Sequence, residues 1–210
     1  MNVRKLDEGD IPQVCMHISS RLLDSVEGSF MVDGLEDKWG LITAYTASRM
    51  KHWQKVGEVW VLENNQGMLT GHYGRNEKMW NLILSGLSLN SIVSKALSKE
   101  DLKRLKYNLQ KMSGAQNISW RKKACKRQEY YYIELITIDR SLKGSGAFRQ
   151  LMEPIIARSQ NEKMPVLLDT HDKNNVPIYQ HFGFELVGEY HSKHDPDIAQ
   201  YSMIKRPCEL

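Results

Sequence analysis

A glycine-bearing turn between a strand and a helix is the feature that most constrains this chain. Residues 129–138 are dense in aromatic and β-branched side chains, as is typical of a central strand. Gly144 and Gly146 follow in the turn. The next residues predict a helix whose buried face carries Phe148, Leu151, Met152, Ile155 and Ile156. A strand, a turn and a helix in this order indicate an α/β fold.

The turn is suited to bind an anion. The first backbone N–H groups of a helix have no intrahelical partner, and the helix dipole favours negative charge near them. Two common phosphate motifs are absent: no G-x-x-x-x-G-K-[ST] sequence occurs, and Arg149 stands where the dinucleotide fingerprint needs its third glycine. The residues alone therefore predict either an anion site or a simple helix cap.

The rest of the chain alternates between strands and helices. We expect strands at residues 2–6, 58–63, 68–73, 164–169, 184–190 and 200–205. We expect helices after Asp10, over residues 37–54, from Ser98 onward and over residues 175–182. Residues 115–128 look basic and loop-like. We therefore predict one domain over residues 1–210, with a helical and basic insertion at about residues 76–128.

Length and composition are those expected of a single soluble domain. The 210 residues suffice for one core, no apolar run is long enough to span a bilayer, and the first residues lack the apolar segment of a signal peptide. The three cysteines lack the spacing of a zinc site. We expect a cytoplasmic protein with reduced thiols, no membrane association and no metal.

The positive charge of the chain is concentrated in one segment. The net charge is +4, yet residues 103–127 contain nine basic side chains and no acidic one. These are Lys103, Arg104, Lys106, Lys111, Arg121, Lys122, Lys123, Lys126 and Arg127. Such a segment is compatible with nucleic acid, an acidic protein surface, cofactor phosphates or a solvated helix face. Only Tyr107 and Trp120 are aromatic there, too few to favour base stacking, so we expect no nucleic-acid partner.

Residues 141–146, Ser-Leu-Lys-Gly-Ser-Gly, resemble the [QR]-x-x-G-x-[GA] coenzyme A motif of the GNAT N-acetyltransferase superfamily. Ser141 replaces the usual Gln or Arg at the first position. Downstream, residues 168–170, 175–179 and 182–184 are similar to the L-x-T, N-x-x-x-Y and G-F elements of the branch that includes puromycin N-acetyltransferase. A proline such as Pro154 within the helix is also familiar in that branch. The resemblance covers residues 129–190 well and residues 76–128 not at all.

The resemblance implies a fold, a cofactor and an activity. The fold would be a mixed, mostly antiparallel sheet with helices on both faces, and the central strand would splay from its neighbour. The activity would be direct transfer of an acetyl group from acetyl-CoA to an amine of a small molecule or peptide. The residues implied to bind the cofactor are Ile136, Thr137, Ile138, Ser141, Lys143, Gly144, Ser145, Gly146, Ala147 and Asn175.

Two residues are the catalytic candidates that the resemblance implies. An acceptor amine arrives mostly as ammonium, so a base must remove its proton, and we assign this role, directly or through water, to Glu134. Strict alternation places Glu134 on one face with Tyr132, Ile136 and Ile138, among apolar neighbours that would favour the protonated carboxyl. Tyr179 would protonate the departing thiolate. A paired surface glutamate and a core tyrosine are the structural alternatives, and His171 and Asp172 are further candidates for lining the acceptor pocket.

The acceptor is not defined by the sequence, and neither is the oligomeric state. Specificity is expected to lie in the N-terminal helices and in residues 76–128. The basic segment could meet the 3′-phosphate of the cofactor or select anionic acceptors. The alternative function is a regulatory module that binds coenzyme A or nucleic acid through residues 103–127 without catalysis.

Overall fold

The computed structural model of the chain describes residues 2–77, 97–125 and 129–208. Seven strands form one sheet in the order β1-β2-β3-β4-β5-β7-β6. The strands are β1 (Val3–Lys5), β2 (Glu58–Leu62), β3 (Gly67–Tyr73), β4 (Tyr131–Ile138), β5 (Val166–Thr170), β6 (Glu185–His191) and β7 (Ala199–Lys205). Among the strands that the structure describes, only β4 and β5 pair in parallel, and the other neighbours are antiparallel. The predicted strands and the mixed, mostly antiparallel sheet are confirmed.

Some helices have the side-chain cap that their sequence suggests, and one does not. The helices are α1 (Ile11–Leu23), α2 (Val26–Met31), α3 (Lys38–Val56), α5 (Lys99–Ser113), α6 (Ser119–Ala124), α7 (Ala147–Glu162) and α8 (Val176–His181). The Ser98 side chain accepts a hydrogen bond from the backbone of Asp101 at 3.0 Å, and Asp37 accepts one from Gly40 at 2.8 Å. Helix α1 begins directly after Asp10, but the Asp10 carboxylate accepts hydrogen bonds from Arg4 and Asn65 and does not cap the helix. Among the described helices, none is long and apolar enough to cross a membrane.

Two stretches differ from the prediction. Helix α2 was not expected, and the supposedly loop-like basic residues form α6, because Trp120 is 4% exposed and packs on the sheet with Tyr130 and Leu167. The helical prediction for residues 78–96 lies outside the described residues.

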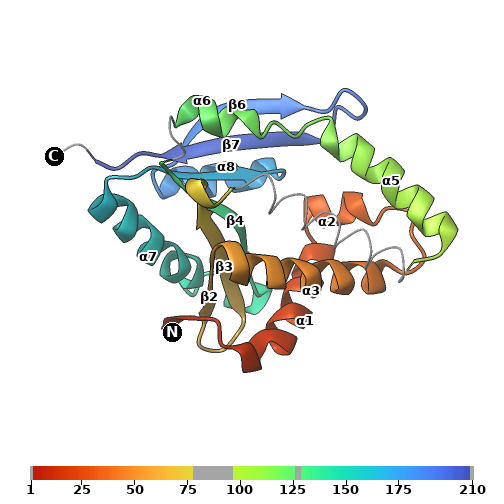
Figure 1. Cartoon of the computed structure of the whole chain (residues 1–210), viewed down its shortest axis with the longest axis horizontal. Helices are drawn as coiled ribbons and strands as arrows, with labels where there is room; N and C mark the ends of the chain where they lie inside the picture. Colours follow the sequence, from red (N-terminus) through yellow and green to blue (C-terminus); the bar gives the residue numbers. More distant parts are fainter. Residues whose placement is uncertain (1, 78–96, 126–128, 209–210) are drawn as a thin grey trace.

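Helices cover both faces of the sheet, as Figure 1 shows. On one face, α7 packs Leu151 and Ile155 against Leu62, Leu69 and Ile133. On the other face, α1 and α3 pack against the strand residues whose side chains point away from α7. This second cluster includes Ile18, Leu41, Ile42, Val59, Val61 and Met68. Helix α7 continues through Pro154, as the resemblance implied.

A β-bulge interrupts the central strand at Glu134. Thr70 of β3 pairs with Leu135, but the next residue, Gly71, pairs with Ile133, so Glu134 is an extra residue in β4. Before the bulge, the side chains that pack toward α7 are those of the odd-numbered Tyr131 and Ile133. After the bulge, they are those of the even-numbered Ile136 and Ile138. The prediction that Glu134 shares a face with Ile136 and Ile138 is therefore wrong, because the bulge reverses the alternation.

Candidate active site

The glycine turn lies directly after β4. Asp139 caps a short 3-10 helix, Arg140–Leu142, by accepting a hydrogen bond from the backbone of Ser141 at 2.8 Å. Gly144 and Gly146 have φ angles of +80° and +82°, in the left-handed region that favours glycine. A Cβ atom at either glycine would meet nothing within 4 Å. Conformation requires glycine at these positions, and the space beside the turn is open.

Several backbone donors in the turn have no acceptor within the described residues. The N–H of Ala147 reaches Ser145 Oγ at 3.3 Å, and that of Ser145 reaches the Leu142 carbonyl at 3.1 Å. The N–H groups without an acceptor there are those of Gly144, Gly146, Phe148 and Arg149. Donors at the start of a 16-residue helix favour an anion. The turn therefore has the geometry of an anion site.

The central strand separates from its parallel neighbour beside this turn. The described pairing of β4 with β5 ends at Ile133 and Leu168, while Ile136, Thr137 and Ile138 pair with β3 only. The expected splay is present. At the end of β5, Asn175 donates a hydrogen bond to Thr170 Oγ1 at 3.1 Å.

Tyr179 lies in α8, on the α7 side of the sheet. Its ring centroid is 5.9 Å from those of Phe148 and Phe184, and the residue is 7% exposed. Burial raises the pKa of the phenol. Burial is the one cause of this shift and no hydrogen bond to another described residue contributes to it, although a buried tyrosine usually finds a partner. The hydroxyl is therefore available to a ligand.

A pocket of about 270 Å³ opens on the other face of the sheet, the face covered by α1 and α3. It is lined by apolar residues such as Leu22, Met31, Val56 and Leu135, and by a group of charged side chains. His171 lines the pocket as expected. Asp172 is not among the lining residues, and its carboxylate instead accepts a hydrogen bond from the backbone of Asn174 at 2.9 Å.

Glu134 lines this pocket but its surroundings differ from the prediction. One carboxylate oxygen pairs with Arg49 of α3, and the other lies 3.5 Å from Nδ1 of His72. The side chain is 19% exposed. The expected apolar neighbours are replaced by cationic and polar ones, and an adjacent guanidinium favours the ionised carboxylate. Glu134 and Tyr179 lie on opposite faces and no contact joins them among the described residues.

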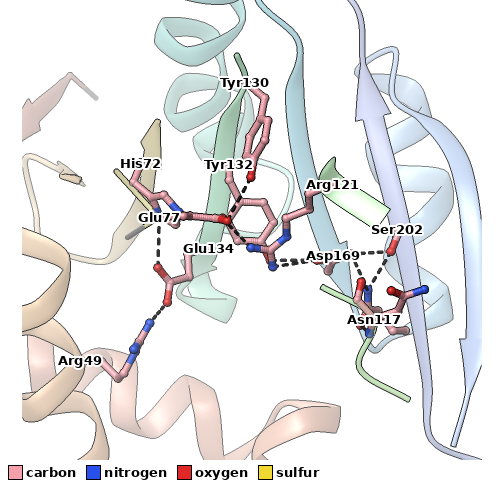
Figure 2. A network of polar contacts seen from close by, with 11 residues as sticks. Arg49, His72, Glu77, Asn117, Arg121, Tyr130, Tyr132, Glu134, Asp169 and Ser202 are labelled. Atoms are coloured by element: carbon pink, nitrogen blue, oxygen red, sulfur yellow. Dashed lines mark hydrogen bonds and ion pairs between the residues drawn. The ribbon is translucent and has the colours of Figure 1, made fainter. Parts of the chain in front are cut away.

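A network of charged side chains extends from Glu134 along the pocket wall, as Figure 2 shows. His72 Nε2 lies 3.1 Å from Glu77, whose carboxylate also accepts hydrogen bonds from Arg121 at 2.7 Å and Tyr130 at 3.0 Å. Burial raises the pKa of Glu77, but the hydrogen bond from His72 and the charge of Arg121 outweigh it and lower the pKa to about 2. Glu77 is therefore ionised at neutral pH.

Arg121 joins the two halves of the network. Its second guanidinium nitrogen donates to Asp169 at 3.2 Å, and its guanidinium lies 3.5 Å from the ring centroid of Tyr132. Asp169 also accepts hydrogen bonds from Gln200 and Ser202 of β7 at 2.9 and 2.6 Å. Arg121 thus joins α6 to Tyr132 of β4 and, through Asp169, to β5 and β7.

The basic segment is partly used inside the molecule. Arg121 is committed to the network, Arg104 pairs with Asp33 at 2.9 Å, and Lys111 pairs with Asp195 at 3.0 Å. The sequence pattern missed Arg49, His72, Glu77 and Arg121 as site residues. Trp120, the single large aromatic residue among the cations of residues 119–127, is the signal that could have placed α6 against the sheet.

Comparisons with known proteins identify the family and the fold. A family model described as an acetyltransferase (GNAT) domain matches residues 92–204, more than half of the chain and further upstream than the expected resemblance. A 54-residue stretch is 35% identical to an uncharacterised N-acetyltransferase of Schizosaccharomyces pombe. It covers 26% of this chain and 22% of that protein, so the match spans about a fifth of the relative's length.

Solved structures show the same fold at low sequence identity. A Corynebacterium glutamicum protein described as a histone acetyltransferase and related acetyltransferase has a TM-score of 0.65 and 14% identity, over 100% of this chain and 97% of that one. A Staphylococcus aureus N-acetyltransferase has a TM-score of 0.60 and 16% identity, over 97% and 100%. An aminoglycoside 6'-N-acetyltransferase complexed with coenzyme A has a TM-score of 0.55 and 8% identity, over 100% and 99%.

Proposed function

Because the chain belongs to the GNAT acetyltransferase family, we propose that it transfers an acetyl group from acetyl-CoA to an amine of a small molecule or peptide. The observation that carries this proposal is the open glycine turn at the point where β4 and β5 separate. Membership of the family supports acetyl transfer in general. The cofactor contacts, the amine and the residue roles are our proposals.

The turn fits the pyrophosphate of acetyl-CoA. Backbone N–H groups at Gly144, Gly146 and the first turn of α7 would hold the phosphates, because glycine leaves room for a close approach. Ser141 supplies no long side chain, so the backbone would do most of the binding. The free edge of β4 at residues 136–138 would pair with the pantetheine arm, and Asn175 would lie beside it.

When bound, acetyl-CoA supplies the thioester that the amine attacks. We propose that Glu134 accepts the proton of the ammonium, since its ionised form is the one that can act as a base and Arg49 favours that form. Tyr179, whose pKa shift includes no hydrogen bond to a described residue, would donate its hydroxyl proton to the departing sulfur.

The charges of the pocket indicate which amines it accepts. Arg49 and Arg121 are both engaged by carboxylates. Burial, followed by the charges of Arg49, His72 and Lys55, lowers the pKa of His52 to about 4, so this imidazole is neutral at neutral pH. The lining carboxylates are Glu27, Glu77, Glu134 and Asp169. An acceptor with its own carboxylate or phosphate would meet net negative charge. We therefore propose acceptors without an anionic group, in place of the hypothesis that the basic segment selects anionic acceptors.

Acetyl-CoA turnover with matched amines tests this proposal. We expect thiol release from acetyl-CoA with 2-phenylethylamine or 1,4-diaminobutane. The matched amino acids, phenylalanine and 4-aminobutyrate, should have a kcat/KM at least about tenfold lower, because like charges in a partly buried site are costly. Equal or better turnover of the amino acids would contradict the acceptor class. No turnover with any amine would contradict the transferase activity.

The role of Tyr179 is tested by Tyr179→Phe. The variant keeps the ring packing but has no proton to donate, so kcat should fall by roughly 10²-fold while the Kd for CoA changes little. Tyr107→Phe is a matched control, because Tyr107 is 51% exposed on α5. A kcat equal to that of the wild type in Tyr179→Phe would remove the proposed acid.

A further inference from the structure

His72 of β3 lies between two carboxylates on the wall of the pocket. Its Nε2 is 3.1 Å from Glu77 Oε1, and its Nδ1 is 3.5 Å from Glu134 Oε2. The imidazole is 9% exposed. Figure 2 shows the ring between the two acidic side chains, with Arg49 on the far side of Glu134. Each ring nitrogen therefore faces an oxygen that can accept a hydrogen bond.

The contacts of Glu77 determine which nitrogen of His72 carries the permanent hydrogen. Glu77 already accepts hydrogen bonds from Arg121 and Tyr130, and the pKa of its carboxyl is lowered to about 2. An ionised carboxylate can only accept. Nε2 of His72 must therefore be the donor in this contact, and in the neutral ring Nδ1 is the nitrogen with a lone pair.

The contact between His72 Nδ1 and Glu134 Oε2 then lacks a hydrogen, so it can take up one proton. If the imidazole is neutral and Glu134 is ionised, a lone pair on Nδ1 faces a lone pair on Glu134 Oε2. A proton placed between these atoms gives either an imidazolium beside a carboxylate or a neutral imidazole beside a carboxyl group. Both arrangements restore a hydrogen bond that the unprotonated pair lacks.

We propose that His72 is the positioning residue that takes from Glu134 the proton removed from the acceptor amine. This rests on the proposed function, in which the ammonium N–H bond breaks and Glu134 becomes a carboxyl group. The carboxyl O–H then breaks, a bond between the proton and His72 Nδ1 forms, and Glu134 returns to the carboxylate. The charge of the pair is conserved, and the imidazolium later loses its proton to water.

The groups around His72 come from four elements. Arg49 and His52 face it from α3, Glu77 follows β3, Tyr132 and Glu134 face it from β4, and Arg121 reaches the network from α6. Glu77 is fixed as an anion by Arg121 and Tyr130, and Arg121 is itself held by two carboxylates. Within this described set, a proton added to the Glu134 and His72 pair completes a hydrogen bond and breaks no other contact, whereas burial and the charges of Arg49, His72 and Lys55 oppose a proton on His52.

The ring tautomer tests the premise on the ligand-free protein. Nitrogen-15 spectra of the full chain with labelled histidine distinguish a ring nitrogen that carries hydrogen from one that does not. At a pH where His72 is neutral, we expect hydrogen on Nε2 and a bare Nδ1, with the signals assigned by their loss in His72→Ala. The opposite tautomer would overturn the relay.

The kinetic test uses chemical rescue, with acetyl-CoA and 2-phenylethylamine as the probes. His72→Ala should lower kcat by about 10²-fold. Imidazole in the buffer should restore part of it, whereas pyrazole, which has a similar shape but is a far weaker base, should not. His191→Ala is the matched control, because His191 also contacts a carboxylate, Glu189 at 2.9 Å, but on the exposed strand β6. Its kcat should equal that of the wild type.

The outcomes separate this inference from the proposed function. A wild-type protein without turnover, or without binding of acetyl-CoA, would overturn both. An active wild type with equally active His72→Ala, or with equal rescue by imidazole and pyrazole, would overturn the relay alone. Selective rescue by imidazole supports it, since a ring that only fills space would be replaced equally well by either compound.

Discussion

At the scale of single residues, Glu77 links the stability of the protein to the electrostatics of its pocket. Its side chain is 10% exposed, and its pKa is lowered from 4.5 to about 2 by His72 and Arg121 against the opposing effect of burial. A carboxyl whose pKa is lower in the folded state stabilises that state at pH values above its unfolded pKa. This contribution is lost as the pH falls from about 4.5 toward 2.

Glu77→Gln should therefore weaken the dependence of stability on acid. We expect the free energy of unfolding of the wild type to fall between pH 6 and pH 3, and the part owed to Glu77 to be on the order of 2 kcal/mol. The variant should be less stable at pH 6 and lose less on acidification, as measured by urea denaturation at several pH values. Glu185→Gln, on the exposed strand β6, is the control. The same slope in the wild type and in Glu77→Gln would contradict this account.

The sequence could identify some candidate site residues but not the side chains that they contact. Glu134 was found because it is a carboxylate within an apolar strand, and Gly144 and Gly146 because they separate a strand from a helix. The contacts of Glu134 with Arg49 and His72 could not be found. These residues are far apart in the chain and meet only after β3 and α3 have packed beside β4.

At the scale of elements, α6 is held by its side chains more than by its own backbone. It has six residues and no side-chain N-cap, so it is too short to be stable alone. Trp120 is buried against the sheet, and Arg121 bridges Glu77 and Asp169. The stability of α6 therefore depends on the ion pairs that its own Arg121 forms with the rest of the molecule.

Arg121→Met should destabilise the fold more than most single changes. The variant keeps a side chain of similar length but leaves two carboxylates, only 10% and 12% exposed, without their cation, and breaking a buried pair in this way typically costs about 3–5 kcal/mol. Lys122→Met is the control, because Lys122 is exposed on the same helix. Chemical denaturation of both variants measures the difference. If Arg121→Met and Lys122→Met were equally stable, α6 would not be anchored as described.

Short elements and irregularities explain most of what the sequence could not predict about the fold. The strands and the longer helices have clear periodicity, and Ser98 and Asp37 mark helix starts as expected. Helices of six residues, such as α2 and α6, are too short for a periodic signal. The bulge at Glu134 adds one residue to β4, and no local pattern distinguishes such an insertion from regular alternation.

At the scale of the whole molecule, two sites on opposite faces of the sheet meet where β4 and β5 separate. The glycine turn and Tyr179 lie with α7 and α8, and the charged pocket lies with α1 and α3. Glu134 and Asp169 follow the last described pair of β4 with β5, Ile133 and Leu168, and both line the pocket. This arrangement supports the proposal that coenzyme A binds at the turn and that the acceptor amine enters the pocket.

Binding of coenzyme A at the turn is the central claim, and thermal stability in its presence tests it most directly. About 1 mM CoA or acetyl-CoA should raise the Tm of the wild type and of Gly9→Glu, a control at another glycine whose added Cβ meets nothing within 4 Å. Gly144→Glu should fold, with a strain of about 1–2 kcal/mol from its left-handed φ, but should show no increase. A wild type without any increase, or an equal increase in Gly144→Glu, would contradict the claim.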